Sequence, residues 1–133
     1  MREWGAGKSR KLLFWHALGP SGSGETIVEV APPLVARGFD VLAVDGPGFG
    51  ASPTLPAHRY ELGPLMELVD GLADELALGK FVFMGHSWGG SIAVHYAALR
   101  PERVEALVLL DSGHIDYGAL PDVETERPLE AWV

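Results

Sequence analysis

Apolar runs alternate with amphipathic stretches along the chain, and this alternation predicts its architecture. Three stretches have apolar residues at helical spacing: 25–37, 62–78, and the segment that follows the third apolar run as far as about Arg100. The apolar runs are short and almost continuous, as in strands buried on both faces of a parallel sheet. They cover residues 12–16, 40–45, 81–84 and 104–110. We therefore predict an α/β fold of three layers, in which helices cover both faces of a mostly parallel sheet.

Glycine and proline mark the expected helix ends. Gly38 and Gly79 follow the first two helical stretches, where glycine is typical of a helix end. Pro32 and Pro33 lie within the first stretch. Because proline lacks the N–H that a helix interior needs, this pair either kinks the helix or marks its true first turn.

Length and composition limit the kind of protein. The 133 residues, 47% hydrophobic and 21% charged, suffice for one globular domain over residues 1–133. The formal net charge is −8 and lysine and arginine form no large cluster, so we expect no nucleic-acid partner. No apolar run approaches membrane-spanning length and the first residues do not resemble a signal peptide. We expect no membrane partner and a cytoplasmic location.

The residue types also limit metal and redox chemistry. The chain has no cysteine, which excludes disulfides and cysteine-ligated zinc. Among its five histidines, no pair has metal-ligand spacing with a third ligand nearby. Neither a metal nor a cofactor is expected.

The most informative motif is Gly85-His86-Ser87-Trp88-Gly89, which lies between a predicted strand and a predicted helix. In this context Gly-x-Ser-x-Gly predicts a nucleophile elbow, a turn so sharp that Gly85 and Gly89 must lack side chains. Ser87 is then forced into a strained backbone conformation with its hydroxyl exposed, as a catalytic nucleophile requires. The alternative is a glycine-rich turn with a helix-capping serine, and the strand and helix context favours the elbow.

A second glycine-rich segment permits two interpretations. Gly46-x-Gly48-x-x-Ala51 follows a predicted strand and matches a loose dinucleotide-binding fingerprint. That fingerprint needs a helix to begin among the glycines. Nearby prolines oppose a helix, and Asp45 places a carboxylate where a phosphate would bind. We therefore favour an irregular loop.

Three ordered motifs resemble the α/β-hydrolase superfamily: His16-Ala17-Leu18-Gly19, the segment from Asp45 to Ser52, and Gly85 to Gly90. Each follows a predicted strand, and the serine at position 87 is similar to the esterases, lactonases and cofactor-free perhydrolases of that superfamily. The resemblance implies an enzyme that cleaves an ester, lactone, thioester or similar small-molecule acyl substrate through an acyl-serine. It also implies that no cofactor takes part.

The resemblance also implies roles for residues around Ser87. The backbone N–H groups of Leu18 and Trp88 would form the oxyanion hole, which stabilises the negative charge that develops on the substrate carbonyl. His16 would orient the loop that carries Leu18. The superfamily commonly has glycine where this chain has Ala17.

The remaining triad members are harder to place. In the superfamily the acid and then the histidine follow the serine along the chain. Asp111 is a candidate acid, or else a carboxylate that caps a turn, and His114 is the one histidine whose place after a strand could bring it near Ser87. We expect the triad histidine outside this chain.

The chain is expected to be a central part of the superfamily fold, without its lid and C-terminal part. Trp4-Gly5 resembles the end of an earlier hairpin. Activity of the chain alone and its oligomeric state stay open. The alternative function is a non-catalytic fragment or interaction module that another chain completes.

Overall fold

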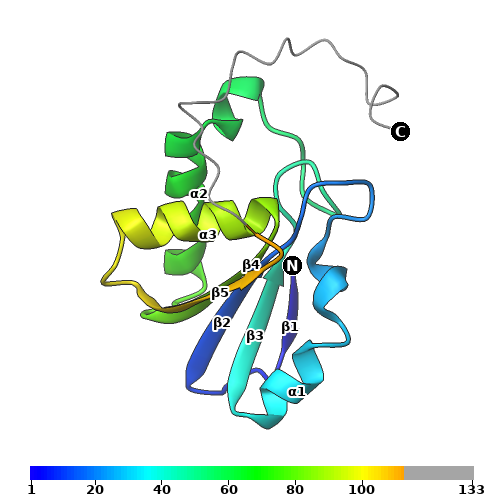
Figure 1. Cartoon of the computed structure of the whole chain (residues 1–133), viewed down its shortest axis with the longest axis vertical. Helices are drawn as coiled ribbons and strands as arrows, with labels where there is room; N and C mark the ends of the chain where they lie inside the picture. Colours follow the sequence, from blue (N-terminus) through cyan, green and yellow to red (C-terminus); the bar gives the residue numbers. More distant parts are fainter. Residues whose placement is uncertain (113–133) are drawn as a thin grey trace.

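Five strands form one sheet in the order β1-β3-β2-β4-β5 in the computed structural model, which describes residues 1–112 (Figure 1). β2 pairs in parallel with β3 and β4, and β4 pairs in parallel with β5, whereas β1 runs antiparallel to β3. The strands are β1 (Arg2–Trp4), β2 (Arg10–Trp15), β3 (Phe39–Val44), β4 (Phe81–His86) and β5 (Val104–Leu110). The four predicted strands and the mostly parallel sheet are confirmed, and β1 adds a short antiparallel edge.

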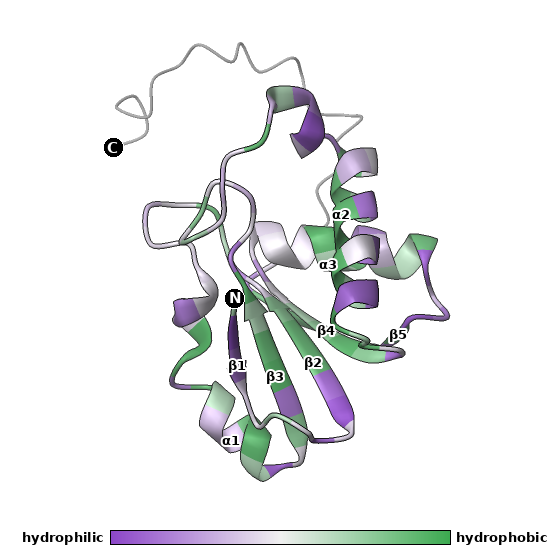
Figure 2. Cartoon of the chain, turned by 180° about the vertical axis from the view of Figure 1, so that it is seen from behind, coloured by the Kyte–Doolittle hydropathy of each residue, from purple (hydrophilic) through white to green (hydrophobic). Residues whose placement is uncertain are grey.

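Helices cover both faces of the sheet. α1 (Ala31–Ala36) lies on one face, and α2 (Leu62–Glu75) and α3 (Trp88–Leu99) lie on the other, as Figures 1 and 2 show. Side chains of β2 alternate between two buried clusters: Leu13 and Trp15 face α2 and α3, while Leu12 and Phe14 face α1. This is the predicted three-layer arrangement.

The first predicted helix is shorter than its apolar spacing indicates. Instead of one helix over residues 25–37, the structure has a 3-10 turn, η1 (Gly24–Ile27), and then α1. Pro32 lies in the first turn of α1, where its missing N–H costs no helical hydrogen bond. Of the two predicted alternatives, the proline pair marks a true first turn.

The second predicted helix also ends early. α2 was expected to run to Leu78 with Gly79 as its stop, but it ends at Glu75. Ala77 adopts a φ of 48°, and the N–H of Leu78 donates to the carbonyl of Ala73. This left-handed closing turn allows buried Leu78 to pack against the core.

The conformation of Ala77 generates a stability prediction. Ala77→Gly should raise the free energy of unfolding by about 1 kcal/mol, because glycine adopts positive φ without the Cβ clash. The same substitution at exposed Ala98, within α3, should lower it by about 1 kcal/mol. Urea unfolding of both variants measures the two values. Equal destabilisation by both would contradict the turn at Ala77.

α3, which follows Ser87, is fixed to α2 by Asp70. The Tyr96 hydroxyl donates to one carboxylate oxygen of Asp70 at 2.9 Å, and Nη2 of Arg100 donates to the other at 2.8 Å. Burial and the hydrogen bond to Asp70 raise the pKa of Tyr96 to about 12. The phenol therefore stays a hydrogen-bond donor, and α3 holds its position over the sheet.

Candidate active site

The turn between β4 and α3 consists of Ser87 alone. β4 ends at His86 and α3 begins at Trp88, and Ser87 has φ 51° and ψ −113°. Such a backbone costs about 1–3 kcal/mol for a residue with a Cβ. The strained conformation predicted for residue 87 is confirmed.

The Ser87 side chain is free for chemistry. The residue is exposed, and its hydroxyl makes no capping hydrogen bond to α3. Its backbone is fully engaged: the N–H donates to the carbonyl of Leu110, and the carbonyl accepts from Gly90 and Ser91. The alternative of a helix-capping serine is wrong.

Gly85 and Gly89 are required by close backbone contacts. A Cβ at Gly85 would lie 2.3 Å from the carbonyl oxygen of Gly89, and a Cβ at Gly89 would lie 2.2 Å from that of Trp15. Neither neighbour can move, because both belong to backbone inside the sheet and helix. The predicted reason for two glycines is confirmed.

These contacts predict the effect of adding a single methyl group. Gly85→Ala and Gly89→Ala should each lower the free energy of unfolding by about 3 kcal/mol, because the methyl group overlaps backbone atoms. Gly71→Ala, in α2, is the matched control: its Cβ would meet nothing within 4 Å, so it should stabilise the protein by about 1 kcal/mol. Thermal or urea unfolding would measure the three variants, and mild effects at Gly85 and Gly89 would contradict the geometry.

The loop after β2 lies directly on the first turn of α3. β2 and β4 are parallel neighbours in which Trp15 pairs with Gly85, so their carboxyl ends share one edge of the sheet. The His16 carbonyl oxygen would be 2.8 Å from a Cβ at Gly89. Leu18 follows in this loop, with 60% of its surface exposed. The structure thus brings the loop of Leu18 beside the elbow.

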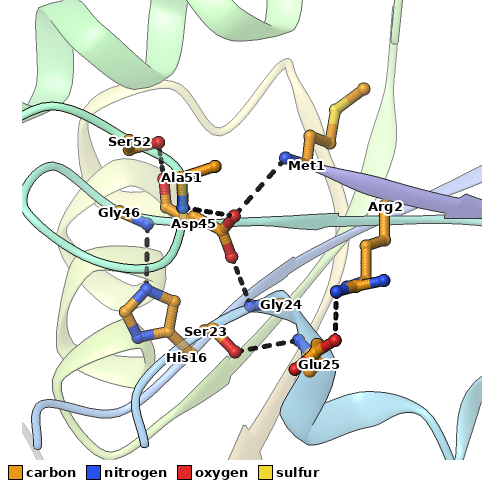
Figure 3. Close-up of polar contacts among 10 residues, drawn as sticks. All are labelled: Met1, Arg2, His16, Ser23, Gly24, Glu25, Asp45, Gly46, Ala51 and Ser52. Atoms are coloured by element: carbon orange, nitrogen blue, oxygen red, sulfur yellow. Dashed lines mark hydrogen bonds and ion pairs between the residues drawn. The ribbon is translucent and has the colours of Figure 1, made fainter. Parts of the chain in front are cut away.

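His16 has both ring nitrogens engaged. The Gly46 N–H donates to Nε2 at 2.8 Å (Figure 3), and Nδ1 lies 2.7 Å from the carbonyl of Ala17. Because a backbone amide can only donate, Nε2 carries no proton and Nδ1 donates. The ring is fully buried. These contacts suit the predicted loop-orienting role and leave no nitrogen for a proton from Ser87.

Aromatic side chains surround His16 below the elbow. The ring of Trp88 meets Trp15 edge-on at 5.9 Å between centroids, and the ring of Phe49 lies 4.9 Å from that of His16. Trp15 is 1% exposed and Trp88 7% exposed. Beside them is a cavity of about 230 Å³ lined mainly by apolar groups, including Trp15, Val44 and Leu72. These aromatic residues therefore form a packed layer, called here the aromatic floor, beneath the loops that follow β2 and β3.

Asp45 joins the loops that follow β2 and β3 (Figure 3). Its carboxylate accepts the Gly24 N–H at 2.8 Å and the Ala51 N–H at 3.3 Å, and it lies 3.6 Å from the Met1 ammonium group. The side chain is only 10% exposed. Burial raises the pKa of Asp45, but the hydrogen bonds from the two amides and the nearby ammonium group together lower it by more. The pKa of Asp45 is therefore below its ordinary value. Sequence reasoning used Asp45 only against phosphate binding and missed these contacts.

The lowered pKa of Asp45 predicts a pH dependence of stability. A carboxylate with a depressed pKa stabilises the folded state above its unfolded pKa, about 3.9, and this stabilisation is lost as pH falls through the folded pKa. Asp45→Asn should therefore cost about 2 kcal/mol at pH 7, and less at pH 3. Urea unfolding at both pH values measures this. Asp74→Asn, at an exposed carboxylate, should change stability by under about 0.5 kcal/mol at pH 7. A cost at Asp45 that does not shrink in acid would oppose this assignment.

Residues 46–56 form an irregular loop, and no helix begins among the glycines. The dinucleotide interpretation is therefore wrong, and the predicted loop is confirmed. Ser52 closes the loop by donating its hydroxyl to the Asp45 carbonyl at 2.7 Å.

The turn after β5 also reaches the elbow. His86 pairs with Leu110, which places Asp111 at the same sheet edge as Ser87, with an exposed side chain and a φ of 45°. A Cβ at Gly90 would lie 2.0 Å from Oγ of Ser112. Sequence reasoning missed the close approach of Ser112 to α3, although Gly90, directly after the Gly-x-Ser-x-Gly motif, was a signal for it. Asp111 stays a candidate acid, and His114 lies outside the described residues.

Within residues 1–112, the histidine and carboxylate side chains do not gather in groups of three or more suited to a metal ion. The helices of the same residues fall short of the length and hydrophobicity that a membrane span requires.

A mostly parallel sheet between helices, with an exposed and strained serine between strand and helix, defines an α/β protein with a sharp strand-to-helix turn. The family described as alpha/beta hydrolase fold matches residues 12–133. The chain therefore belongs to the α/β-hydrolase family.

Known relatives agree with this membership. The chain is 38% identical over 112 residues to the 2-hydroxy-6-oxononadienedioate/2-hydroxy-6-oxononatrienedioate hydrolase of Cupriavidus pinatubonensis, covering 82% of this chain and 38% of the relative. It is 37% identical over 122 residues to the sn-1-specific diacylglycerol lipase ABHD11 of Danio rerio, covering 86% and 37%. The structure of a hydrolase from Pseudomonas aeruginosa matches with a TM-score of 0.75 and 32% identity, covering 84% and 40%. The chain thus spans about two fifths of the length of these hydrolases.

Proposed function

We propose that the protein is a serine hydrolase in which Ser87 attacks the carbonyl carbon of an ester, lactone or thioester. The carrying observation is the backbone of Ser87, with φ 51° and ψ −113°, which presents an exposed and uncapped hydroxyl at the start of α3. Strain of this kind at an exposed nucleophilic side chain is typical of functional sites. Relatives named as hydrolases and a lipase support the reaction class.

The proposed reaction proceeds in two steps. Oγ of Ser87 forms a bond to the acyl carbon while its proton passes to a general base, and the alcohol or thiol leaves with that proton. Water, deprotonated by the same base, then bonds to the acyl carbon; the bond from that carbon to Oγ breaks, the base returns the proton to Oγ, and the acid is released.

The N–H groups of Trp88 and Leu18 are proposed to hold the negative oxygen of each intermediate. The Trp88 N–H is the first of α3, where a helix has no internal acceptor and its dipole favours negative charge. Preorganised donors of this kind usually supply the largest catalytic contribution. The loop contacts at His16 support the placement of Leu18 beside them.

The general base is proposed to lie outside residues 1–112. His16 cannot serve, because an amide N–H and a carbonyl occupy its two nitrogens. Asp111 is the proposed acid partner, since it follows β5 at the edge that holds Ser87. A small-molecule acyl substrate and a cytoplasmic location stay predictions from sequence.

A fluorescent fluorophosphonate, which phosphonylates an activated serine, tests the proposal. The protein should take the label on Ser87, and Ser87→Ala should reduce labelling to background because the attacking oxygen is lost. Ser91→Ala is the matched control in the same helix; this buried serine should not affect labelling. Gel fluorescence and peptide mapping give the measurement. Equal labelling of Ser87→Ala would count against the assignment, and so would a lack of labelling in a protein that contains the general base.

A second candidate function is a non-catalytic module that another chain completes. The observation in its favour is β5, the last strand of the sheet within residues 1–112, where Leu107, Leu109 and Leu110 are 37–43% exposed. This candidate predicts that the chain alone takes no label and that labelling appears when the second chain is added.

A further inference from the structure

The loop that carries Leu18 is attached at both ends to two consecutive residues, Asp45 and Gly46. At its start, His16 accepts the Gly46 N–H at 2.8 Å, and at its end the Gly24 N–H donates to Oδ1 of Asp45 at 2.8 Å (Figure 3). Between these anchors the loop is tightened by a turn in which the Gly22 N–H donates to the Gly19 carbonyl. Residues 17–23 therefore form a bridge whose two supports are both at the end of β3.

The backbone at Gly50 and Gly24 lies unusually close to the Asp45 carboxylate and to the end of β3. A Cβ at Gly50, where φ is 51°, would lie 2.5 Å from Cγ of Asp45, and a Cβ at Gly24 would lie 2.8 Å from the Ala43 carbonyl. Only glycine at these two positions lets both loops reach the carboxylate. The charged groups facing it are few: the Met1 ammonium group at 3.6 Å is the one ion-pair partner of Asp45 among residues 1–112.

The two anchors differ in what their loss would do. His16 also packs against Phe49 and lies in the core, so its removal disturbs the floor of the site. Loss of the Asp45 carboxylate would release the far end of the loop, together with the Ala51 N–H and the Met1 ammonium group, while the hydrogen bond from Gly46 to His16 stays. An oxyanion donor in a loop with one free end spends part of its time out of place, and small misplacement of such groups slows a reaction strongly.

We propose that Asp45 is a positioning residue for the serine hydrolysis proposed above: it holds the end of the loop 16–24 and thereby fixes the Leu18 N–H for the oxyanion. This inference rests on the proposed function of Ser87. Asp45 would influence the reaction only through the position of the loop that carries Leu18.

Two variants at position 45 test the inference. Asp45→Ala removes every side-chain acceptor, whereas Asp45→Asn retains one carbonyl oxygen for the Gly24 N–H. By amide exchange measured with NMR, Asp45→Ala should speed exchange at Gly24 and Gly22 about tenfold, while Gly46, held by His16, should keep its protection. Asp45→Asn should restore most of the protection at Gly24. Asp74→Asn serves as the control for loss of a carboxylate elsewhere.

The reactive readout is the rate of fluorophosphonate inactivation, separated into kinact and KI. Asp45→Ala should lower kinact about tenfold with little change in KI, and Asp45→Asn should recover most of kinact. A merely structural role would instead lower the fraction of protein that takes the label. If Asp45→Ala does not fold, Gly50→Ala displaces the same carboxylate without removing it, and Gly63→Ala, whose Cβ meets nothing within 4 Å, is its control.

The results separate this inference from the proposed function. Unchanged exchange at Gly24 and Gly22, or faster exchange with unchanged kinact, would overturn the role of Asp45 while leaving Ser87 as the nucleophile. Failure of Ser87 to take the label in a protein that contains the general base would overturn the proposed function, and the positioning role with it.

Discussion

The change from strand to helix across a single residue is the constraint on which the site depends. Because β4 ends immediately before Ser87 and α3 begins immediately after it, the inside of the turn has no room for side chains at Gly85 or Gly89. A strained turn relaxes unless its surroundings hold it. Here β4 lies between β2 and β5, the Ser87 N–H is tied to Leu110, and α3 is fixed to α2 through Asp70. The hydroxyl therefore stays exposed at the edge of the sheet.

Local signals predicted the strands and the elbow well, and helix ends poorly. A continuous apolar run or a Gly-x-Ser-x-Gly turn depends on residues adjacent in sequence, so the pattern determines the structure. Helix limits depend on competition: apolar spacing favoured a helix over 25–37, but Pro32 allowed it only from Ala31. The second helix was expected to continue to Leu78 and stop at Gly79, but it ends earlier, at Glu75. Ala77 adopts the left-handed conformation that glycine prefers, because this turn buries Leu78.

The contacts missed by sequence reasoning join residues far apart in the chain. The Gly24 N–H donates to Asp45, 21 residues away, and the Ser112 hydroxyl donates to the carbonyl of Gly85, 27 residues away. Neither pair leaves a periodic signal in the sequence. From the sequence, Asp45 served only to exclude phosphate binding. Its amide partners, Gly24 and Ala51, come close to it only because the parallel sheet aligns the ends of β2 and β3.

The strand order explains why these distant residues act on one loop. In a parallel sheet the carboxyl ends of neighbouring strands share an edge, and the order β3-β2-β4 places the loop of Leu18 between Asp45 on one side and the elbow on the other. On the elbow side, the end of β2 lies close against the backbone of α3, because the Trp15 carbonyl oxygen would be 2.2 Å from a Cβ at Gly89. The loop cannot withdraw without breaking the hydrogen bonds to Gly46 and Asp45. The close contact of β2 with α3 on one side and the hydrogen bonds to Gly46 and Asp45 on the other therefore hold the two ends of this loop in place.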